Sequence, residues 1–248
     1  MDEAFESDGL RLGAHLARPT GPAPVAGVVL CHGFPSGPRG AVTSAATYPE
    51  LADRIARDTG WAALAFNLRG TGTSEGDFSI GGWLHDLHVA VGVLAERAGV
   101  SGVWIAGMGE GGALALCAAQ ADERVRGVAA LGAPVSLRDW AREPARLLEH
   151  ARRLGMVRKS GYPPDMAAWG REVGTLDAVG AARRLAPRPL LVVHGSADDT
   201  VRPDDARALS EAAGPSAELR IVHAAGHRLR HDPRAVAVFL GWLGRQTT

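Results

Sequence analysis

The segment that most constrains the fold of this 248-residue chain is a short apolar run followed at once by a cluster of glycines. Residues 103–106 are apolar and partly β-branched, which is typical of a buried strand. Residues 107–112 read Gly-Met-Gly-Glu-Gly-Gly, and the alanine- and leucine-rich residues 113–120 predict a helix. Only small residues let a helix leave a strand so sharply. The sequence therefore predicts a strand, a tight turn and a buried helix, with Gly109 at the turn and its φ angle above zero.

Apolar strands and helices alternate through most of the chain. Asp8-Gly9 predicts a turn between two antiparallel strands at the start. The further predicted elements are amphipathic helices at residues 44–58 and 82–98, strands at 125–131 and 217–222, and a closing helix at 233–245. Apolar strands separated by helices predict a parallel sheet that is covered on both faces.

Four loops between these elements carry distinctive residues. An apolar strand at 28–31 ends in His-Gly-Phe-Pro, and another at 63–67 leads into Leu-Arg-Gly-Thr-Gly-Thr-Ser. A late strand at 190–195 is followed by Ser-Ala-Asp-Asp, and residues 224–227 read Ala-Ala-Gly-His. In this order the loops resemble the oxyanion loop, the Arg-Gly loop, the acid-bearing loop and the histidine loop of the α/β-hydrolase fold family. Residues 107–111 resemble that family's nucleophile elbow, G-x-S-x-G, with glycine in place of the central serine.

This resemblance implies a mainly parallel sheet of about eight strands with helices on both faces and a small helical cap. One domain is expected over residues 1–248. The cap is expected at residues 133–174, where the alternation gives way to helices, between the strand after the elbow and the acid-bearing strand. An ordinary surface excursion is the alternative for that segment.

The family's Ser-His-Asp triad corresponds here to Gly109, His227 and Asp198. The resemblance implies that Asp198 fixes the His227 ring, which then takes a proton from a water or a substrate atom above Gly109. The backbone N–H groups of Phe34 and Glu110 are the expected oxyanion-hole donors. We expect the Glu110 side chain to point away along the helix. Asp199 is the alternative acid.

Several other residues have two interpretations each. Within the cap, four side chains are expected to line the substrate pocket, although each is also explained by packing: Trp140, Met156, Tyr162 and Trp169. Around His227, four basic side chains form either a rim for an anionic substrate or a solvated loop: His223, Arg228, Arg230 and His231. Packing is the expected role of His32.

Composition narrows the function classes. The formal net charge is zero, which gives no electrostatic footprint for nucleic acid or an anionic membrane. No apolar segment is long enough to span a bilayer.

The two cysteines, Cys31 and Cys117, are expected to be structural thiols in a reducing compartment, which favours the cytoplasm. No spacing indicates a metal site, and no cofactor is expected. The expected partner is a small molecule; a homodimer is compatible with the sequence.

These observations leave four functional hypotheses. The first is hydrolysis of an ester, thioester or amide by the His227–Asp198 dyad with a backbone oxyanion hole. The second is proton-transfer chemistry, such as elimination or isomerisation, by the same base. The third is a non-catalytic protein that binds a ligand or partner in the pocket, and the fourth is an ordinary serine hydrolase whose serine has been replaced by design. Retention of both His227 and Asp198 favours chemistry over binding alone.

Overall fold

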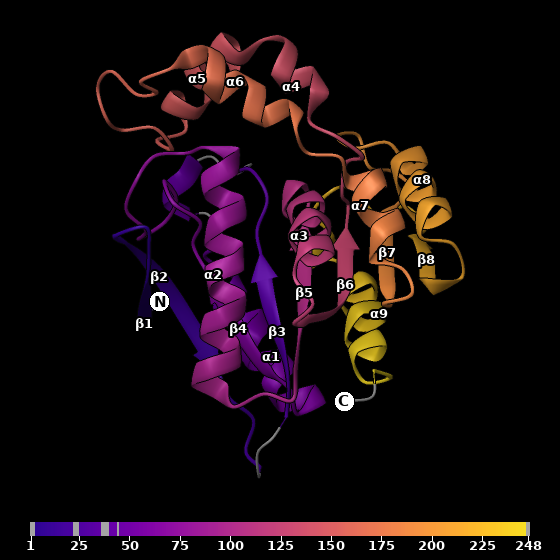
Figure 1. Cartoon of the computed structure of the whole chain (residues 1–248). Helices are drawn as coiled ribbons and strands as arrows, with labels where there is room; N and C mark the ends of the chain where they lie inside the picture. Colours follow the sequence, from indigo (N-terminus) through magenta and orange to yellow (C-terminus); the bar gives the residue numbers. More distant parts are fainter. Residues whose placement is uncertain (1–2, 22–24, 36–39, 44, 247–248) are drawn as a thin grey trace.

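An eight-stranded sheet forms the centre of the computed structural model, which describes residues 3–21, 25–35, 40–43 and 45–246 (Figure 1). Its strands are β1 (Glu3–Ser7), β2 (Leu10–Ala17), β3 (Ala26–Cys31), β4 (Ala62–Phe66), β5 (Gly102–Met108), β6 (Val125–Leu131), β7 (Leu190–Gly195) and β8 (Ala217–Val222). They lie in the order β1-β2-β4-β3-β5-β6-β7-β8. β1 and β2 run antiparallel to their neighbours, and all later pairs are parallel. The predicted fold class is confirmed.

The central strands are apolar on both faces because helices cover both. Along β3, Val28 and Leu30 pack into one apolar core, and Val29 and Cys31 into the other. This alternation is the pattern of a strand buried between two helical layers. At the open edge, the predicted hairpin turn is present, with positive φ at both Asp8 and Gly9.

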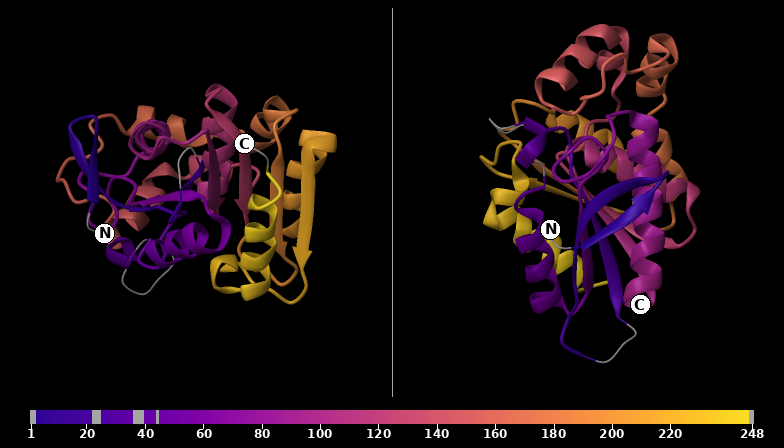
Figure 2. Two further views of the ribbon diagram at one scale, coloured as in Figure 1. Left: turned by 90° about the horizontal axis from the view of Figure 1, so that it is seen from below. Right: turned by 90° about the vertical axis from the view of Figure 1, so that its left-hand side faces the viewer.

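Two helical layers enclose the sheet, as Figure 2 shows from two further directions. One layer consists of α1 (Tyr48–Thr59) and α9 (Pro233–Leu243), and the other of α2 (Ile80–Ala98), α3 (Glu110–Ala121), α7 (Ala178–Leu185) and α8 (Pro203–Ala213). The helix predicted from Ser44 begins later, at Tyr48 with Pro49 in its first turn; Ser44 itself lies outside the described residues. α2 begins before the predicted start because the Ser79 side chain accepts a hydrogen bond from the Gly82 N–H. No helix in the described ranges is both long and apolar enough to cross a membrane.

The segment predicted as a cap folds into helices that stand over the carboxyl ends of the parallel strands (Figures 1 and 2). They are α4 (Arg138–Arg142), α5 (Pro144–Arg153) and α6 (Met166–Gly174). Short 3-10 turns lie at Gly40–Thr43, Gly214–Ser216 and Leu229–His231. The carboxyl ends of β3, β5, β7 and β8 lie at the same edge of the sheet, beneath this cap (Figure 1). Open α/β sheets bind ligands at that edge.

Candidate active site

A sharp turn carries the chain from β5 into α3. Gly109 lies at this turn with φ 58° and ψ −130°, which only glycine adopts without strain. The flanking glycines allow close packing, since a Cβ on Gly107 would clash with the Gly111 carbonyl and one on Gly111 would lie 2.5 Å from the Cys31 carbonyl oxygen. A Cβ on Gly109 would instead meet Nε2 of His227 at 3.4 Å. There is therefore space for a side chain at position 109, and it faces the imidazole of His227.

The imidazole of His227 is held by Asp198. Nδ1 of His227 lies 2.9 Å from Oδ2 of Asp198, whose side chain is fully buried, whereas that of His227 is 21% exposed. A carboxylate oxygen accepts, so Nδ1 donates, and Nε2 of the neutral ring keeps its lone pair toward Gly109. Asp199, the alternative acid, is exposed and accepts a hydrogen bond from its neighbour Thr200.

The Asp198 carboxylate is fixed by several donors besides His227. Its Oδ1 accepts the backbone N–H groups of Thr200 and Val201, each at 2.9 Å. On the other side, Nε2 of the fully buried His194 lies 3.3 Å from Oδ2 and 2.9 Å from the Val201 carbonyl oxygen. Because a carbonyl only accepts, Nε2 of His194 carries the proton. These donors around the Asp198 carboxylate fix its orientation and, through it, the orientation of the His227 ring.

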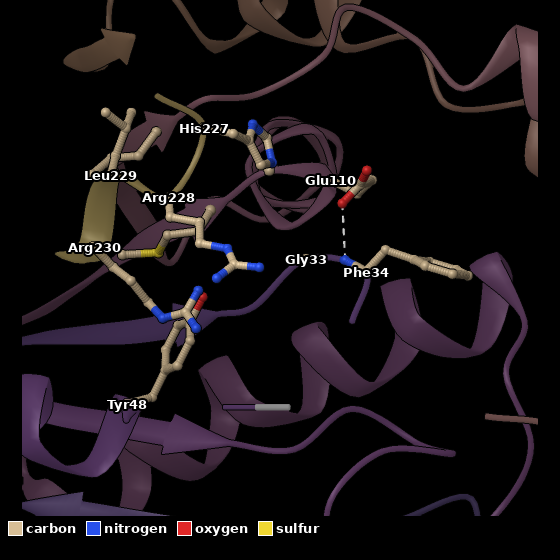
Figure 3. A pocket seen from close by; sticks show the side chains of 11 residues that line it. Gly33, Phe34, Tyr48, Glu110, His227, Arg228, Leu229 and Arg230 are labelled. Carbon is tan, nitrogen blue, oxygen red and sulfur yellow. Dashed lines mark hydrogen bonds between the residues drawn. The ribbon is translucent and has the colours of Figure 1, made fainter. Parts of the chain in front are cut away.

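The Glu110 side chain departs from the expectation that it points away along the helix. Its Oε2 accepts the Phe34 N–H at 2.9 Å, the bond drawn as a dashed line in Figure 3. A carboxylate at the first turn of a helix, beside an outward-pointing N–H, is stabilised by the helix dipole and by a charge-assisted hydrogen bond. One of the two predicted oxyanion-hole donors therefore already has a partner.

Two cavities meet at His227. A small cavity of about 40 Å³ lies over Gly109 and is lined on its far side by Tyr48, Arg228 and Arg230 (Figure 3). Arg230 stacks over the Tyr48 ring, 5.4 Å from its centroid. A larger cavity of about 740 Å³ opens towards the cap and shares His227, Glu110 and Arg228 with the small one. Three of the basic residues near His227 therefore line a cavity: Arg228, Arg230 and His231. The sequence had left open whether these side chains form a rim or a solvated loop.

Only one of the four predicted cap side chains lines these cavities. Trp140 is in the wall of the large cavity and packs on Phe34, with ring centroids 4.7 Å apart. Met156 and Trp169 are instead buried in the apolar core, where the Trp169 Nε1–H donates to the Phe78 carbonyl, and Tyr162 is a half-buried residue packed against the same core. The expectations for Met156 and Trp169 are corrected: both side chains are buried because the apolar face of the cap packs on the domain. Tyr162 lines neither cavity, and its role in the substrate pocket stays a prediction.

Two further groups contribute to the site although no sequence pattern marked them. Tyr48, from α1, had no motif to mark it, and His194 was visible only as part of the strand before Asp198. His32 is the packing residue expected: it is buried, and its ring nitrogens lie at hydrogen-bonding distance from Gly33 and Thr71. Among the described residues, no cluster of three or more histidine, cysteine or acidic side chains is arranged to hold a metal ion.

Comparisons with known proteins agree with this architecture. Residues 27–178 match a family model described as alpha/beta hydrolase fold. Among solved structures, the α/β hydrolase GrgF from Penicillium sp. sh18 is 20% identical with a TM-score of 0.75, covering 99% of this chain and 98% of its own. Est1E from Butyrivibrio proteoclasticus, bound to ferulic acid, is 19% identical with a TM-score of 0.71 (98% and 96% covered). The esterase domain of a Rhodothermus marinus protein is 24% identical with a TM-score of 0.67 (98% and 95% covered). Curated proteins gave no match.

Proposed function

Because this chain belongs to the α/β-hydrolase fold family, we propose that it is an enzyme whose His227–Asp198 dyad is a general base for a small molecule bound over Gly109. One observation carries the proposal: Nε2 of His227 lies 3.4 Å from the place that a Cβ on Gly109 would take, while Nδ1 is bonded to Asp198. A binding protein needs neither the buried carboxylate nor its orienting donors. General-base catalysis needs both.

The first candidate reaction is hydrolysis of an ester, thioester or amide without an acyl-enzyme. His227 takes a proton from a water in the cavity over Gly109, and the oxygen of that water attacks the carbonyl carbon. The tetrahedral intermediate then expels the leaving group, which receives the proton from the imidazolium. The names of the similar structures, an esterase domain and Est1E with ferulic acid, support a substrate with an acyl group. The developing oxyanion requires the N–H groups of Phe34 and Glu110, so the Glu110 carboxylate must first move away.

The second candidate is proton transfer without attack on a carbonyl, as in an elimination or isomerisation. The observation that favours it is the Glu110 carboxylate on the Phe34 N–H. With that group in place, a negative oxygen on the substrate is not stabilised, but His227 remains free to remove a proton.

The proposal includes a cytoplasmic location. Cys31 and Cys117 are free and buried, and burial raises the pKa of both thiols, that of Cys117 to about 11. Such thiols are poor nucleophiles and fit a role in packing.

The test is a substrate panel of aryl esters, thioesters and carbon acids, assayed with the unchanged chain and with His227→Ala. We expect turnover without a burst phase and a loss of roughly a hundred- to ten-thousand-fold in the variant, which is the usual contribution of a general base. His223→Ala, in the same loop but outside both cavities, is the matched control and should keep full activity. Fluorophosphonate probes should not label the unchanged chain. Unchanged turnover in His227→Ala, or labelling at a serine such as Ser74 or Ser196, would contradict the proposal.

A further inference from the structure

The Glu110 carboxylate lies beside the two N–H groups that are the expected oxyanion-hole donors. Oε2 accepts the Phe34 N–H at 2.9 Å. A Cβ built on Gly33 would lie 2.7 Å from that oxygen and 3.1 Å from the Glu110 backbone nitrogen. The Met108 carbonyl oxygen lies 2.6 Å from the same point. The carboxylate oxygen therefore lies next to the Glu110 backbone nitrogen and bonds the Phe34 N–H, the two groups expected to donate to an oxyanion.

This arrangement reverses the polarity of the site. Two N–H groups present hydrogen-bond donors to a carbonyl oxygen, whereas a carboxylate presents only acceptors. A carbonyl oxygen or an oxyanion placed beside the carboxylate would lose its donor and meet a negative charge. A hydroxyl or an ammonium group would gain a charge-assisted hydrogen bond.

The surroundings of the carboxylate favour a negative charge. Glu110 is the first residue of the twelve-residue helix α3, whose N-terminal end favours negative charge. The guanidinium groups of Arg228 and Arg230 line the same small cavity, and Figure 3 shows them across from Glu110. Gly109 has no side chain that could compete for the space.

From this geometry we propose that Glu110 is the specificity-determining residue of the site: its carboxylate closes the oxyanion hole to carbonyl oxygens and selects ligands that present a hydroxyl group there. An ammonium group is disfavoured by the guanidinium groups of Arg228 and Arg230 in the same cavity. This deepens the proposed function, on which it rests for the position of the reacting group beside His227. Reaction at a carbonyl then requires that the carboxylate be displaced or removed.

The first measurement follows the hydrogen bond between Phe34 and Glu110. The Phe34 amide proton signal in NMR spectra should move in Glu110→Ala, which removes the accepting carboxylate, and should stay in place in Asp139→Ala. A Phe34 signal at the same position in the unchanged chain and in Glu110→Ala would overturn the inference.

The second measurement places a nucleophile at position 109 and tests whether the N–H groups of Phe34 and Glu110 are accessible to an oxygen of the reagent. In Gly109→Ser, attack of the serine oxygen on a fluorophosphonate forms the O–P bond and expels fluoride, and His227 takes the serine proton. The phosphoryl oxygen must be bound by the N–H groups of the oxyanion hole for this attack to be fast. Removal of a single oxyanion donor costs about a hundred- to a thousand-fold, so Gly109→Ser/Glu110→Ala should be labelled at least tenfold faster than Gly109→Ser. Asp139→Ala, which removes an exposed carboxylate of the cap, is the matched control and should not accelerate labelling of Gly109→Ser.

The outcomes separate this inference from the proposed function. Equal labelling of Gly109→Ser with and without Glu110→Ala, or none in either, would overturn the role of Glu110. Adding His227→Ala to the double variant tests the base alone: labelling that persists at full rate would remove His227 from the proposed function and leave the role of Glu110 standing. The expected result is fast labelling of the double variant that is lost without His227.

Discussion

Three buried or half-buried histidines differ in function because their ring nitrogens have different partners. In His32, Nδ1 lies 2.8 Å from the Gly33 carbonyl oxygen, and Nε2 accepts the Leu68 N–H at 3.2 Å. In His194, Nε2 is held by the Val201 carbonyl and Asp198. Of these three, it is His227 whose Nε2 is directed at a cavity. The partners, rather than the residue type, determine which histidine can act as a base.

Because the His32 ring is buried, we expect the folded protein to lose stability in acid. Burial lowers the pKa of His32 from 6.5 to about 4. In the unfolded chain the ring protonates below pH 6.5, while in the folded chain it stays neutral down to about pH 4. The resulting stability is complete above pH 6.5 and is lost as the pH falls towards 4, by about 3 kcal/mol at most.

Urea denaturation at several pH values between 7 and 4 measures this effect. His32→Gln, which cannot titrate, should have a free energy of unfolding that depends less on pH over this range. The same acid-induced loss in the unchanged chain and in the variant would show that other groups are responsible.

At the scale of elements, a buried ion pair joins the N-terminal hairpin to the loop after β4 and to α2. The Asp86 carboxylate in α2 is fully buried and accepts hydrogen bonds from the Arg69 Nε and the Ser7 hydroxyl, and the closest Arg69–Asp86 contact is 2.7 Å. Arg69 also reaches Asp8 at the hairpin turn. The arginine of this loop therefore has a structural role, away from His227.

Removal of the shared carboxylate should be costly. Asp86→Ala leaves the Arg69 guanidinium, 12% exposed, without its buried partner, so we expect a loss of about 3–5 kcal/mol in the free energy of unfolding. The control is Asp139→Ala, which breaks the exposed pair with Arg142 and should cost less than about 1 kcal/mol. Similar small losses in both, measured by urea denaturation, would mean that the buried pair contributes little.

Sequence patterns predicted the elements better than the direction of individual side chains. The apolar runs at β5, β6 and β7 define those strands because burial on both faces leaves little choice of residue. By contrast, nothing in Gly-Met-Gly-Glu-Gly-Gly indicates that the Glu110 side chain returns to Phe34, since that contact depends on how the loop after β3 packs on α3. The inward direction of Met156 and Trp169 likewise depends on where the cap rests.

At the scale of the whole molecule, the candidate site lies between segments that follow the strands of the sheet, which carry His227, Asp198 and Glu110, and a cap that supplies part of the cavity wall. Phe34 joins the two: its ring packs edge-on against Trp140 and stacks on His150 of α5, with centroids 4.7 Å and 5.7 Å away. The Phe34 N–H is also the donor to Glu110. Movement of the cap would therefore act on the residue whose N–H bonds Glu110.

The two cap tryptophans allow the binding and packing roles of the cap to be separated. Trp140 lines the large cavity, whereas Trp169 is 3% exposed and bonded to the Phe78 carbonyl. Trp140→Ala removes wall contacts and should raise the KM of a substrate found by the panel roughly tenfold, equivalent to about 1.4 kcal/mol, with little change in the free energy of unfolding. Trp169→Ala leaves a cavity and an unpaired carbonyl in the core and should lower that free energy by about 3–5 kcal/mol. Urea denaturation and steady-state kinetics on both variants decide the matter: a Trp140→Ala protein as unstable as Trp169→Ala, with unchanged KM, would place Trp140 in the core instead of the substrate wall.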